Sequence, residues 1–291
     1  VKDNEGFPPI STSNTIPHGG EITIKGHISS QYLSAILMIT PFLKGESIIN
    51  IEGDLCSKPY IDITLKLLEE FGLIAENNEY QQFKIAGEQL AKPPKTYRIE
   101  ADASSASYIA AYAALNKDTP ITIKNLSQSS IQGDIEFMRY LEIMGCDISS
   151  DHQGTRFTGP KKLKRLGEIN MNHTPDLVMT FAILSIFAEG ITKISNIPNL
   201  RIKETDRIEA LENELGKLGI EISTGKDYIE IESKGHLNHD VSAEIETYDD
   251  HRIAMCFGIL TNNYPGIKIL NPGCVSKSYT TFWDDINKLK Q

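Results

Sequence analysis

The sequence predicts an α/β fold built from repeats of one βαβαββ unit. Strand-like segments begin at Glu21, Tyr97, Glu168 and Ala243, roughly 70 to 76 residues apart. Each is followed by an apolar segment of helix length, then by a β-branched strand and a second, more amphipathic helix. A period of this length indicates a supersecondary unit that has been copied several times. The whole chain from Glu21 onward is covered by four copies.

The first helix of each copy is predicted to be buried, because its sequence is apolar on nearly every face. The four segments are "SSQYLSAILMITPFL" (29–43), "SSASYIAAYAALN" (104–116), "TPDLVMTFAILSIFA" (174–188) and "DHRIAMCFGILTN" (250–262).

The remaining elements follow in the same order in each copy. The second strands are predicted at 46–53, 119–126, 190–197 and 266–272, and the second helices at 58–72, 133–145, 199–219 and 280–290. The first three copies end in two short polar strands, which are clearest in "IEISTGKDYIEIES" (220–233) with its Gly-Lys-Asp turn.

Composition excludes several classes of protein. The 291 residues carry a net charge of −10, which argues against nonspecific nucleic-acid binding, and no apolar run is long enough to span a membrane. Four cysteines lie far apart without CxxC spacing, so we expect a reduced compartment and no zinc site. The first residues, "VKDNEGFPPISTSN", have no signal-peptide or transit-peptide character and are expected to begin in mid-domain.

Cations at predicted helix starts indicate an anion site. Lys203 and Arg207 are placed four apart on the first turn of the helix predicted over 199–219, where like charges repel and the macrodipole disfavours cations. Arg252 and Lys277 occupy equivalent junctions between strand and helix, which is where α/β folds bind ligands. Three such junctions in an acidic chain favour one shared anion such as a phosphate dianion, and the alternative is a salt-bridged surface.

Other junctions carry polar residues that also suit helix capping. Ser29-Ser30-Gln31 can cap a helix or bind phosphate oxygens, whereas Ser104–Ser107 is interpreted as a cap and packing device. Thr174-Pro175-Asp176 has the pattern of a cap, a first-turn proline and a dipole-favoured acid. In "YDDHR" (248–252) either aspartate can cap, but a cap does not explain the cation that follows.

Five long motifs together resemble the bacterial type of the 5-enolpyruvylshikimate-3-phosphate synthase family: "ISSQYLSAIL", "GDLCSKPYIDITL", "MNHTPD", "NLRIKETDR" and "YDDHRIAM". The resemblance runs over nearly the whole chain. It implies the inside-out α/β barrel domains of enolpyruvyl transferases, and a cytoplasmic enzyme of aromatic amino acid biosynthesis. The reaction it implies transfers the enolpyruvyl group of phosphoenolpyruvate to the 5-hydroxyl of shikimate 3-phosphate, with release of phosphate and without a metal or organic cofactor.

The resemblance also assigns roles to individual residues. It implies that Asp176 is the base toward the 5-hydroxyl, that Glu204 transfers a proton at the phosphoenolpyruvate methylene, and that His251 is an active-site residue. The residues implied in binding shikimate 3-phosphate are Ser29, Ser30, Gln31, Ser57, Tyr60, Asn199 and Lys203. Those implied in binding phosphoenolpyruvate are Arg207, Arg252 and Lys277.

The sequence departs from the family in length. Family members have two domains of three units each, so four of six units are expected here, with the last unit of an incomplete first domain in residues 1–100 and a three-unit second domain in 101–291. We expect the first segment to expose apolar residues such as Leu33, Ile36, Leu37 and Leu43, and to self-associate or to bind an N-terminal fragment. The chain alone is then expected to be poorly active.

Two other functions remain open. The chain can be a noncatalytic binding module that retains half of a cleft. It can also be a UDP-N-acetylglucosamine enolpyruvyl transferase, although that family relies on a cysteine in an earlier loop and lacks the combination of "KPYIDITL" and "KETDR" found here.

Overall fold

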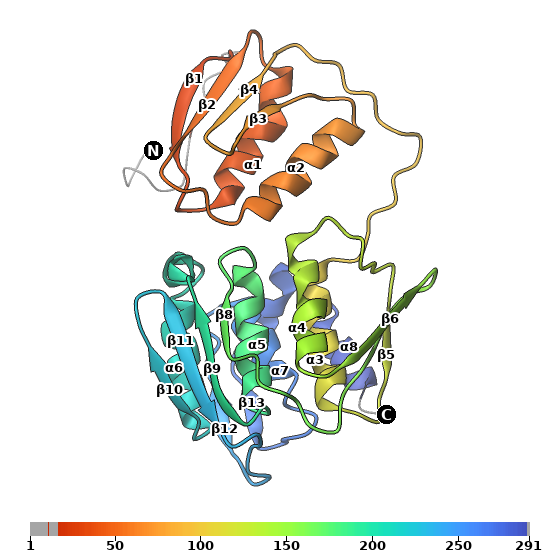
Figure 1. Cartoon of the computed structure of the whole chain (residues 1–291), viewed down its shortest axis with the longest axis vertical. Coiled ribbons are helices and arrows are strands. Elements are labelled where there is room, and N and C mark those ends of the chain that lie inside the picture. Colours follow the sequence, from red (N-terminus) through yellow and green to blue (C-terminus); the bar gives the residue numbers. More distant parts are fainter. Residues whose placement is uncertain (1–10, 12–16, 290–291) are drawn as a thin grey trace. The chain divides into compact units, whose positions relative to one another are not determined.

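The computed structural model describes residue 11 and residues 17–289, which form two compact units (Figure 1). The first unit consists of the described residues of Val1–Gly26 together with Gln31–Leu55 and Thr64–Lys95. The second consists of His27–Ser30, Cys56–Ile63 and the described part of Thr96–Gln291.

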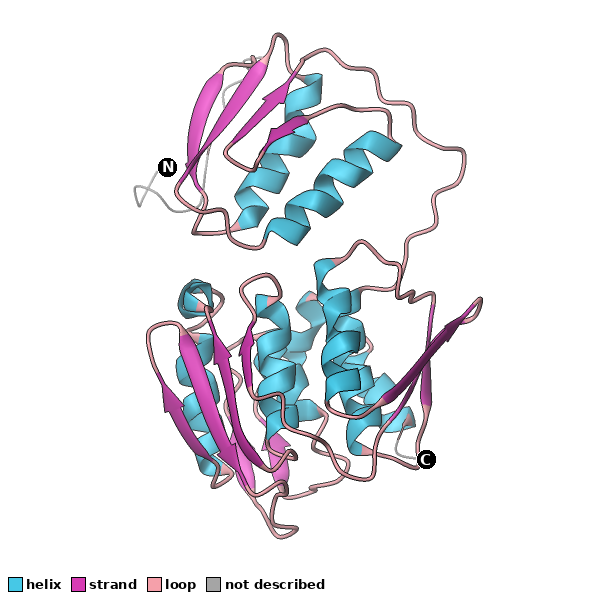
Figure 2. Ribbon diagram, in the orientation of Figure 1, coloured by secondary structure: helices cyan, strands magenta, loops and turns pink. Residues whose placement is uncertain are grey.

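The first unit contains a four-stranded sheet with the order β1-β2-β4-β3. Its strands are β1 (Glu21–Lys25), β2 (Ser47–Glu52), β3 (Glu76–Asn78) and β4 (Gln82–Ile85). It also contains α1 (Ser30–Ile39) except its first residue, and α2 (Lys58–Glu70) from Thr64 onward. β1 and β2 are parallel because α1 connects them as a crossover, and β3 and β4 form the closing antiparallel hairpin. Figure 2 shows both helices on the same side of this sheet. The predicted βαβαββ order is confirmed here.

Helix α1 is only half buried, so the prediction of complete burial is wrong for this helix. Leu33 and Leu37 are fully buried, and Ile36 and Leu43 are partly buried, which also corrects the expectation that these four would be exposed. The exposed apolar side chains lie on the other face of the helix and in the turn that follows it. They are Tyr32, Met38, Ile39 and Phe42.

Three buried helices form the centre of the second unit. α3 (Ala103–Leu115), α5 (Val178–Ser185) and α7 (His251–Gly258) are buried along nearly their whole length, as predicted from their apolar sequences. α3 contacts α5 and α5 contacts α7, and Figure 1 shows them between two sheets. This core is one continuous apolar cluster.

Strands and amphipathic helices surround that core. The strands are β5 (Ile121–Lys124), β6 (Asp147–Asp151), β7 (Gly154–Thr158), β8 (Glu168–Asn170), β9 (Gly190–Ser195), β10 (Glu221–Thr224), β11 (Tyr228–Ser233), β12 (Ala243–Ile245) and β13 (Ile267–Ile269). They form sheets of order β5-β7-β6, β10-β11-β9-β8 and β12-β13. The outer helices are α4 (Phe137–Ile143), α6 (Arg207–Lys217) and α8 (Phe282–Lys288). In the described part of the chain no helix has the length and apolar character needed to cross a bilayer.

The strand predicted to begin at Tyr97 is absent from the described structure. Residues 96–102 have no strand assignment, and they make one backbone hydrogen bond to the β5 region, from Ala101 N to Asn125 O at 2.9 Å. Asn125 has φ of +57°, a left-handed conformation that turns the chain away at the end of β5. One backbone hydrogen bond does not make a ladder, so the predicted strand does not form.

Candidate active site

Charged side chains gather where α5, α6 and α7 begin, and two carboxylates shape these starts. Asp206 caps α6, because its Oδ1 accepts from the backbone N–H groups of Ile208 and Glu209 at 3.1 and 3.0 Å. Asp250 caps α7 by accepting from Arg252 N at 2.8 Å. A 3₁₀ turn, η3 (Pro175–Leu177), leads into α5 and carries Asp176.

The start of α6 corrects one step of the sequence argument. The helix begins at Arg207, after its cap, so Lys203 lies in the preceding loop and not on the first helical turn. The residues before the loop form η4 (Pro198–Ile202), a 3₁₀ helix. Lys203 and Arg207 are therefore not an i, i+4 pair on one helix face.

Arg207 binds three carboxylates although it is 1% exposed. Its Nε donates to Asp250 Oδ2 at 2.8 Å, its Nη1 to Asp176 Oδ1 at 3.1 Å, and its Nη2 to Glu204 Oε2 at 2.8 Å. A buried guanidinium requires partners of this kind, because an unpaired charge in the interior is very costly.

Asp176 connects the two arginines. Its Oδ1 accepts from Arg207, and its Oδ2 accepts from Arg252 Nη2 at 2.7 Å. Burial alone would raise the pKa of Asp176, but the charges of Arg252, Arg207 and Lys203 together hold that pKa below its ordinary value. Asp176 is therefore ionised at neutral pH.

Glu204 connects Arg207 to Lys277, whose Nζ donates to Glu204 Oε1. Partial burial opposes ionisation, but the hydrogen bond from Lys277 and the charge of Arg207 lower the pKa of Glu204 to about 2. This second carboxylate is thus held as an anion between two cations.

His251 is buried at the start of α7, with its Nδ1 3.7 Å from Asp250 Oδ1. Burial, reinforced by the nearby charge of Arg252, lowers the pKa of His251 to about 4. Asn199, in η4, is also buried, and its Oδ1 is without a hydrogen-bond partner among the described residues. Such an atom is available to a ligand.

The structure therefore brings together most of the residues that the sequence selected in the second domain. The cations converge from different elements: Arg207 and Arg252 from first helical turns, and Lys277 from the end of the 3₁₀ helix Pro272–Lys277. Protein carboxylates pair with all three. The set in mutual contact comprises Asp176, Glu204, Arg207, Arg252 and Lys277, with His251 adjacent.

The remaining selected residues lie at the starts of α1 and α2. Ser29, Ser30 and Gln31 are at the start of α1, where Ser30 is buried. Ser57 precedes α2, is buried, and has φ of +54°, a conformation that costs a non-glycine residue energy and is enriched at functional sites. Tyr60 lies in the first turn of α2, in the stretch Cys56–Ile63 that groups with the second unit.

Sequence reasoning missed Asp134, a buried carboxylate in the 3₁₀ turn η2 (Gly133–Glu136) before α4. Its Oδ2 accepts from Ser104 Oγ, and its Oδ1 accepts from the Tyr60 hydroxyl at 2.9 Å. The cap of α3 is Asp102, so Ser104 is not the cap that the sequence suggested. One signal was available: at the junction where the other three copies carry a lysine, this copy carries Gly133-Asp134.

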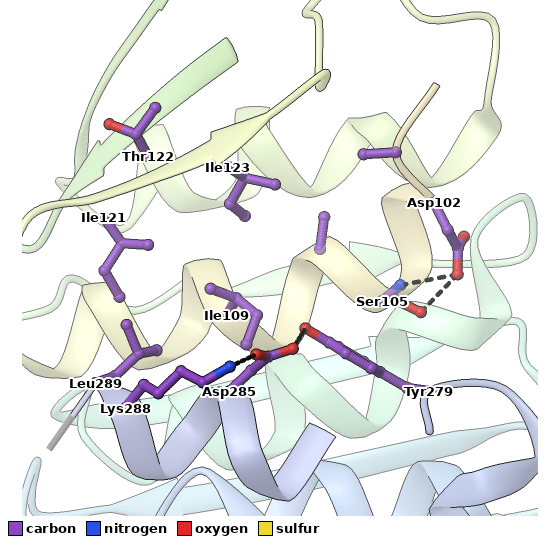
Figure 3. A pocket seen from close by; sticks show the side chains of 12 residues that line it. Asp102, Ser105, Ile109, Ile121, Thr122, Ile123, Tyr279, Asp285, Lys288 and Leu289 are labelled. Atoms are coloured by element: carbon purple, nitrogen blue, oxygen red, sulfur yellow. Dashed lines mark hydrogen bonds and ion pairs between the residues drawn. The ribbon is translucent and has the colours of Figure 1, made fainter. Parts of the chain in front are cut away.

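A separate cavity of about 400 Å³ lies among α3, β5 and α8 (Figure 3). Its walls are mainly apolar, and the carboxylates at its edge are already paired, Asp102 with Ser105 and Asp285 with Tyr279 and Lys288. No selected site residue lines it. Among residues 17–289 no group of three His, Cys, Asp or Glu side chains could hold a metal ion.

Comparison with known proteins gives a consistent family. The model of the EPSP synthase (3-phosphoshikimate 1-carboxyvinyltransferase) family matches residues 1–286. The chain is 42% identical over 290 residues to the 3-phosphoshikimate 1-carboxyvinyltransferase of Photobacterium profundum, and 44% identical over 288 residues to that of Pasteurella multocida. These matches cover 99% of this chain but only 66% and 64% of the two relatives.

Solved structures agree on the fold. An EPSP synthase from Acinetobacter baumannii superposes with a TM-score of 0.72 at 23% identity, covering 94% of this chain and 62% of that one. The enolpyruvyl transferase NikO from Streptomyces tendae superposes with a TM-score of 0.66 at 16% identity, covering 92% and 63%. From its match to the family model and its identity to these relatives, the chain belongs to the EPSP synthase family.

Proposed function

We propose that this chain contributes the second-domain half of an active site that transfers the enolpyruvyl group of phosphoenolpyruvate to the 5-hydroxyl of shikimate 3-phosphate. The observation that carries the proposal is the pair of carboxylates, Asp176 and Glu204, that share Arg207 and are each held by one further cation. Two separated carboxylates suit a reaction that removes one proton from oxygen and delivers one to carbon.

Asp176 is the proposed base. It is ionised, and its Oδ2 faces Arg252 at the start of α7. In the addition step the substrate hydroxyl loses its proton to this carboxylate as the oxygen bonds to C2 of phosphoenolpyruvate. The methylene carbon gains a proton from protonated Glu204 in the same step, which gives a tetrahedral intermediate. In the elimination its methyl group loses a proton to Glu204 as phosphate leaves.

Glu204 is the proposed proton-transfer residue at the phosphoenolpyruvate methylene. To donate a proton there it must first be protonated. With a pKa of about 2 it is an anion while Lys277 and Arg207 hold it. An anionic substrate that takes over those cations would raise the proton affinity of Glu204. We therefore assign Arg207, Arg252 and Lys277 to the phosphate and carboxylate of phosphoenolpyruvate, with His251 adjacent to this site.

Shikimate 3-phosphate is assigned to Ser29, Ser30, Gln31, Ser57, Tyr60, Asn199 and Lys203. Buried hydroxyls and the unpaired Asn199 Oδ1 support this assignment, because polar atoms of this kind are matched to a polyhydroxylated ligand. No metal or organic cofactor enters the proposed reaction.

The proposed architecture has four of the six units of the family's inside-out barrels, with the last unit of a first domain in residues 1–100 and a three-unit second domain in 101–291. It is supported by the recurrence of the element order and by coverage of 64 to 66% of the relatives' length. We place the protein in the cytoplasm. We further propose that apolar side chains on α1 mediate self-association or bind an N-terminal fragment, since several are exposed.

The test is an assay of phosphate release from shikimate 3-phosphate plus phosphoenolpyruvate, with the chain alone and with an N-terminal fragment of a related synthase. We expect Asp176→Ala and Glu204→Ala to lower turnover by about 10²–10⁴-fold while changing shikimate 3-phosphate affinity far less. Near-normal turnover in both variants would refute the assignment.

Two alternatives give different results in the same experiments. A noncatalytic half-site module would show thermal stabilisation by shikimate 3-phosphate without turnover under either condition. A UDP-N-acetylglucosamine enolpyruvyl transferase would release phosphate only when that nucleotide sugar replaced shikimate 3-phosphate.

A further inference from the structure

Asp134 is a buried carboxylate held by hydroxyl groups alone. It is 2% exposed, and among the ion pairs of the described residues none includes it. Its Oδ2 accepts from Ser104 Oγ of α3, and its Oδ1 accepts from Tyr60 of α2. A carboxylate in these surroundings keeps a higher proton affinity than one bound to arginine.

The contact with Tyr60 depends on the residue before Asp134. A Cβ atom built on Gly133 would lie 2.4 Å from Pro59 Cβ, which is closer than side-chain carbons can approach. Glycine at 133 therefore lets the turn η2 pack directly against Pro59 and place Asp134 beside the Tyr60 hydroxyl.

The same hydroxyl also reaches Asp176. Tyr60 Oη lies 2.9 Å from Asp134 Oδ1 and 3.5 Å from Asp176 Oδ2. A phenol has one proton to donate, so it cannot bond fully to both carboxylates. Two carboxylates, Asp134 buried and Asp176 18% exposed, thus meet at one donor, and they repel each other when both are ionised.

Their surroundings push their proton affinities apart. Burial first, and then the charge of Asp176, raises the pKa of Asp134 to about 6, whereas Arg252, Arg207 and Lys203 keep the pKa of Asp176 low. Two neighbouring titratable groups whose pKa values differ in this way are typical of sites in which one group acts as an acid and the other as a base. Because the two carboxylates interact, each observed titration step reflects both of them. The charged or titratable groups around Asp134 are Tyr60 on α2, Asp176 on η3 and Arg252 on α7.

We propose that Asp134 is a positioning residue for Asp176: across the Tyr60 hydroxyl that both carboxylates approach, its negative charge offsets the arginines that would otherwise make Asp176 a weak base. The inference rests on the proposed role of Asp176 as the base toward the substrate hydroxyl. It adds a residue that shares the Tyr60 hydroxyl with the proposed base and is not assigned to the substrate.

The coupling is tested by titrating the whole chain with ¹³C-labelled aspartate carboxyls, in the absence of substrate. One carboxyl is expected to titrate near pH 6 and to disappear in Asp134→Asn. In Asp176→Asn the same signal should shift to lower pH, because the repelling charge is gone. Gly133→Ala should also shift it, since that change pushes Pro59 and Tyr60 away without removing a titratable group.

Glu214→Gln is the matched control. Glu214 is also fully buried, but it belongs to a separate cluster with Lys217 and Tyr248, so its loss should leave the pH 6 signal in place. An Asp134 carboxyl that titrates in the ordinary range of aspartate, or that ignores Asp176→Asn, would overturn the proposal.

A kinetic measurement separates positioning from a merely structural role. The kcat of the wild type should fall as pH drops through about 6. Asp134→Asn should be about tenfold slower at neutral pH, and its kcat should not fall in this pH range. A kcat of Asp134→Asn that still falls as pH drops through about 6 would contradict the proposal. If the wild-type chain titrates as expected but has no turnover, the proposed function fails for this chain and the coupling between the two aspartates stands.

Discussion

Arg207 and Asp250 form an ion pair in which both side chains are buried, with Nε donating to Oδ2 at 2.8 Å and exposed fractions of 1% and 0%. The pair ties the start of α6 to the start of α7. Asp250 also caps α7, so one carboxylate serves both helices. The candidate site is therefore built on a buried charge network that also holds the second unit together.

Asp250→Ala should destabilise the chain strongly. Removing one partner of a buried ion pair leaves an uncompensated charge and costs about 3–5 kcal/mol. Urea unfolding followed by circular dichroism measures this loss as a lower transition midpoint. The control is Asp206→Ala, which removes the cap of α6 at a partly exposed position and should cost about 1 kcal/mol. Equal losses of stability in Asp250→Ala and Asp206→Ala would mean that the buried ion pair of Arg207 with Asp250 adds nothing to the stability of the fold.

Stability should depend on pH through His251. Its pKa is lowered to about 4 in the folded chain, below the ordinary value of 6.5, so the unfolded chain binds a proton there that the folded chain refuses. Its contribution to the free energy of unfolding is therefore greatest above pH 6.5 and falls as pH drops toward 4. Unfolding midpoints across this range should be flatter in His251→Gln than in the wild type. The exposed His236→Gln should keep the wild-type slope, and an unchanged slope in His251→Gln would contradict the assignment.

Lys277 should control the ionisation of Glu204. Replacing Lys277 with Met removes the hydrogen bond that lowers the pKa of Glu204 most, so that pKa should rise from about 2 toward its ordinary value. Carboxyl titration by NMR detects the change directly. Lys288→Met, which breaks an ion pair with Asp285 on α8, is the control and should leave Glu204 unaffected. A Glu204 that still titrates near pH 2 in Lys277→Met would show that Lys277 does not control its pKa.

The sequence predicted the repeat and the buried helices because both are local properties. A period of apolar and β-branched segments is readable along the chain, and α3, α5 and α7 are apolar enough to be buried whatever packs on them. The burial of α1 was not predictable in this way, since its exposed face depends on which neighbours are present. The helix start at Arg207 was misplaced because the motif before it forms 3₁₀ structure.

The partners of the cations were also beyond local reasoning. Arg207 meets Asp250 and Asp176 at sequence separations of 43 and 31 residues, so no spacing rule connects them. The positions of Arg207 and Arg252 at predicted helix starts did predict that these two cations would converge. Protein carboxylates pair with these cations in the structure, and the binding of an external anion by them stays a prediction.

The exposed face of α1 should make the chain self-associate. Tyr32, Met38, Ile39 and Phe42 are between 47% and 61% exposed and lie within eleven positions of one another along the first unit. Contiguous apolar surface of this kind marks an interaction site or an aggregation liability. Light scattering after size exclusion should give a mass that rises with concentration for the wild type and stays at 32.4 kDa for the double variant Met38→Gln/Phe42→Ser. Leu90→Ser serves as the control, because Leu90 is an exposed apolar residue of the same unit that lies outside this face. A wild-type chain that is monomeric at every concentration would contradict self-association through this face.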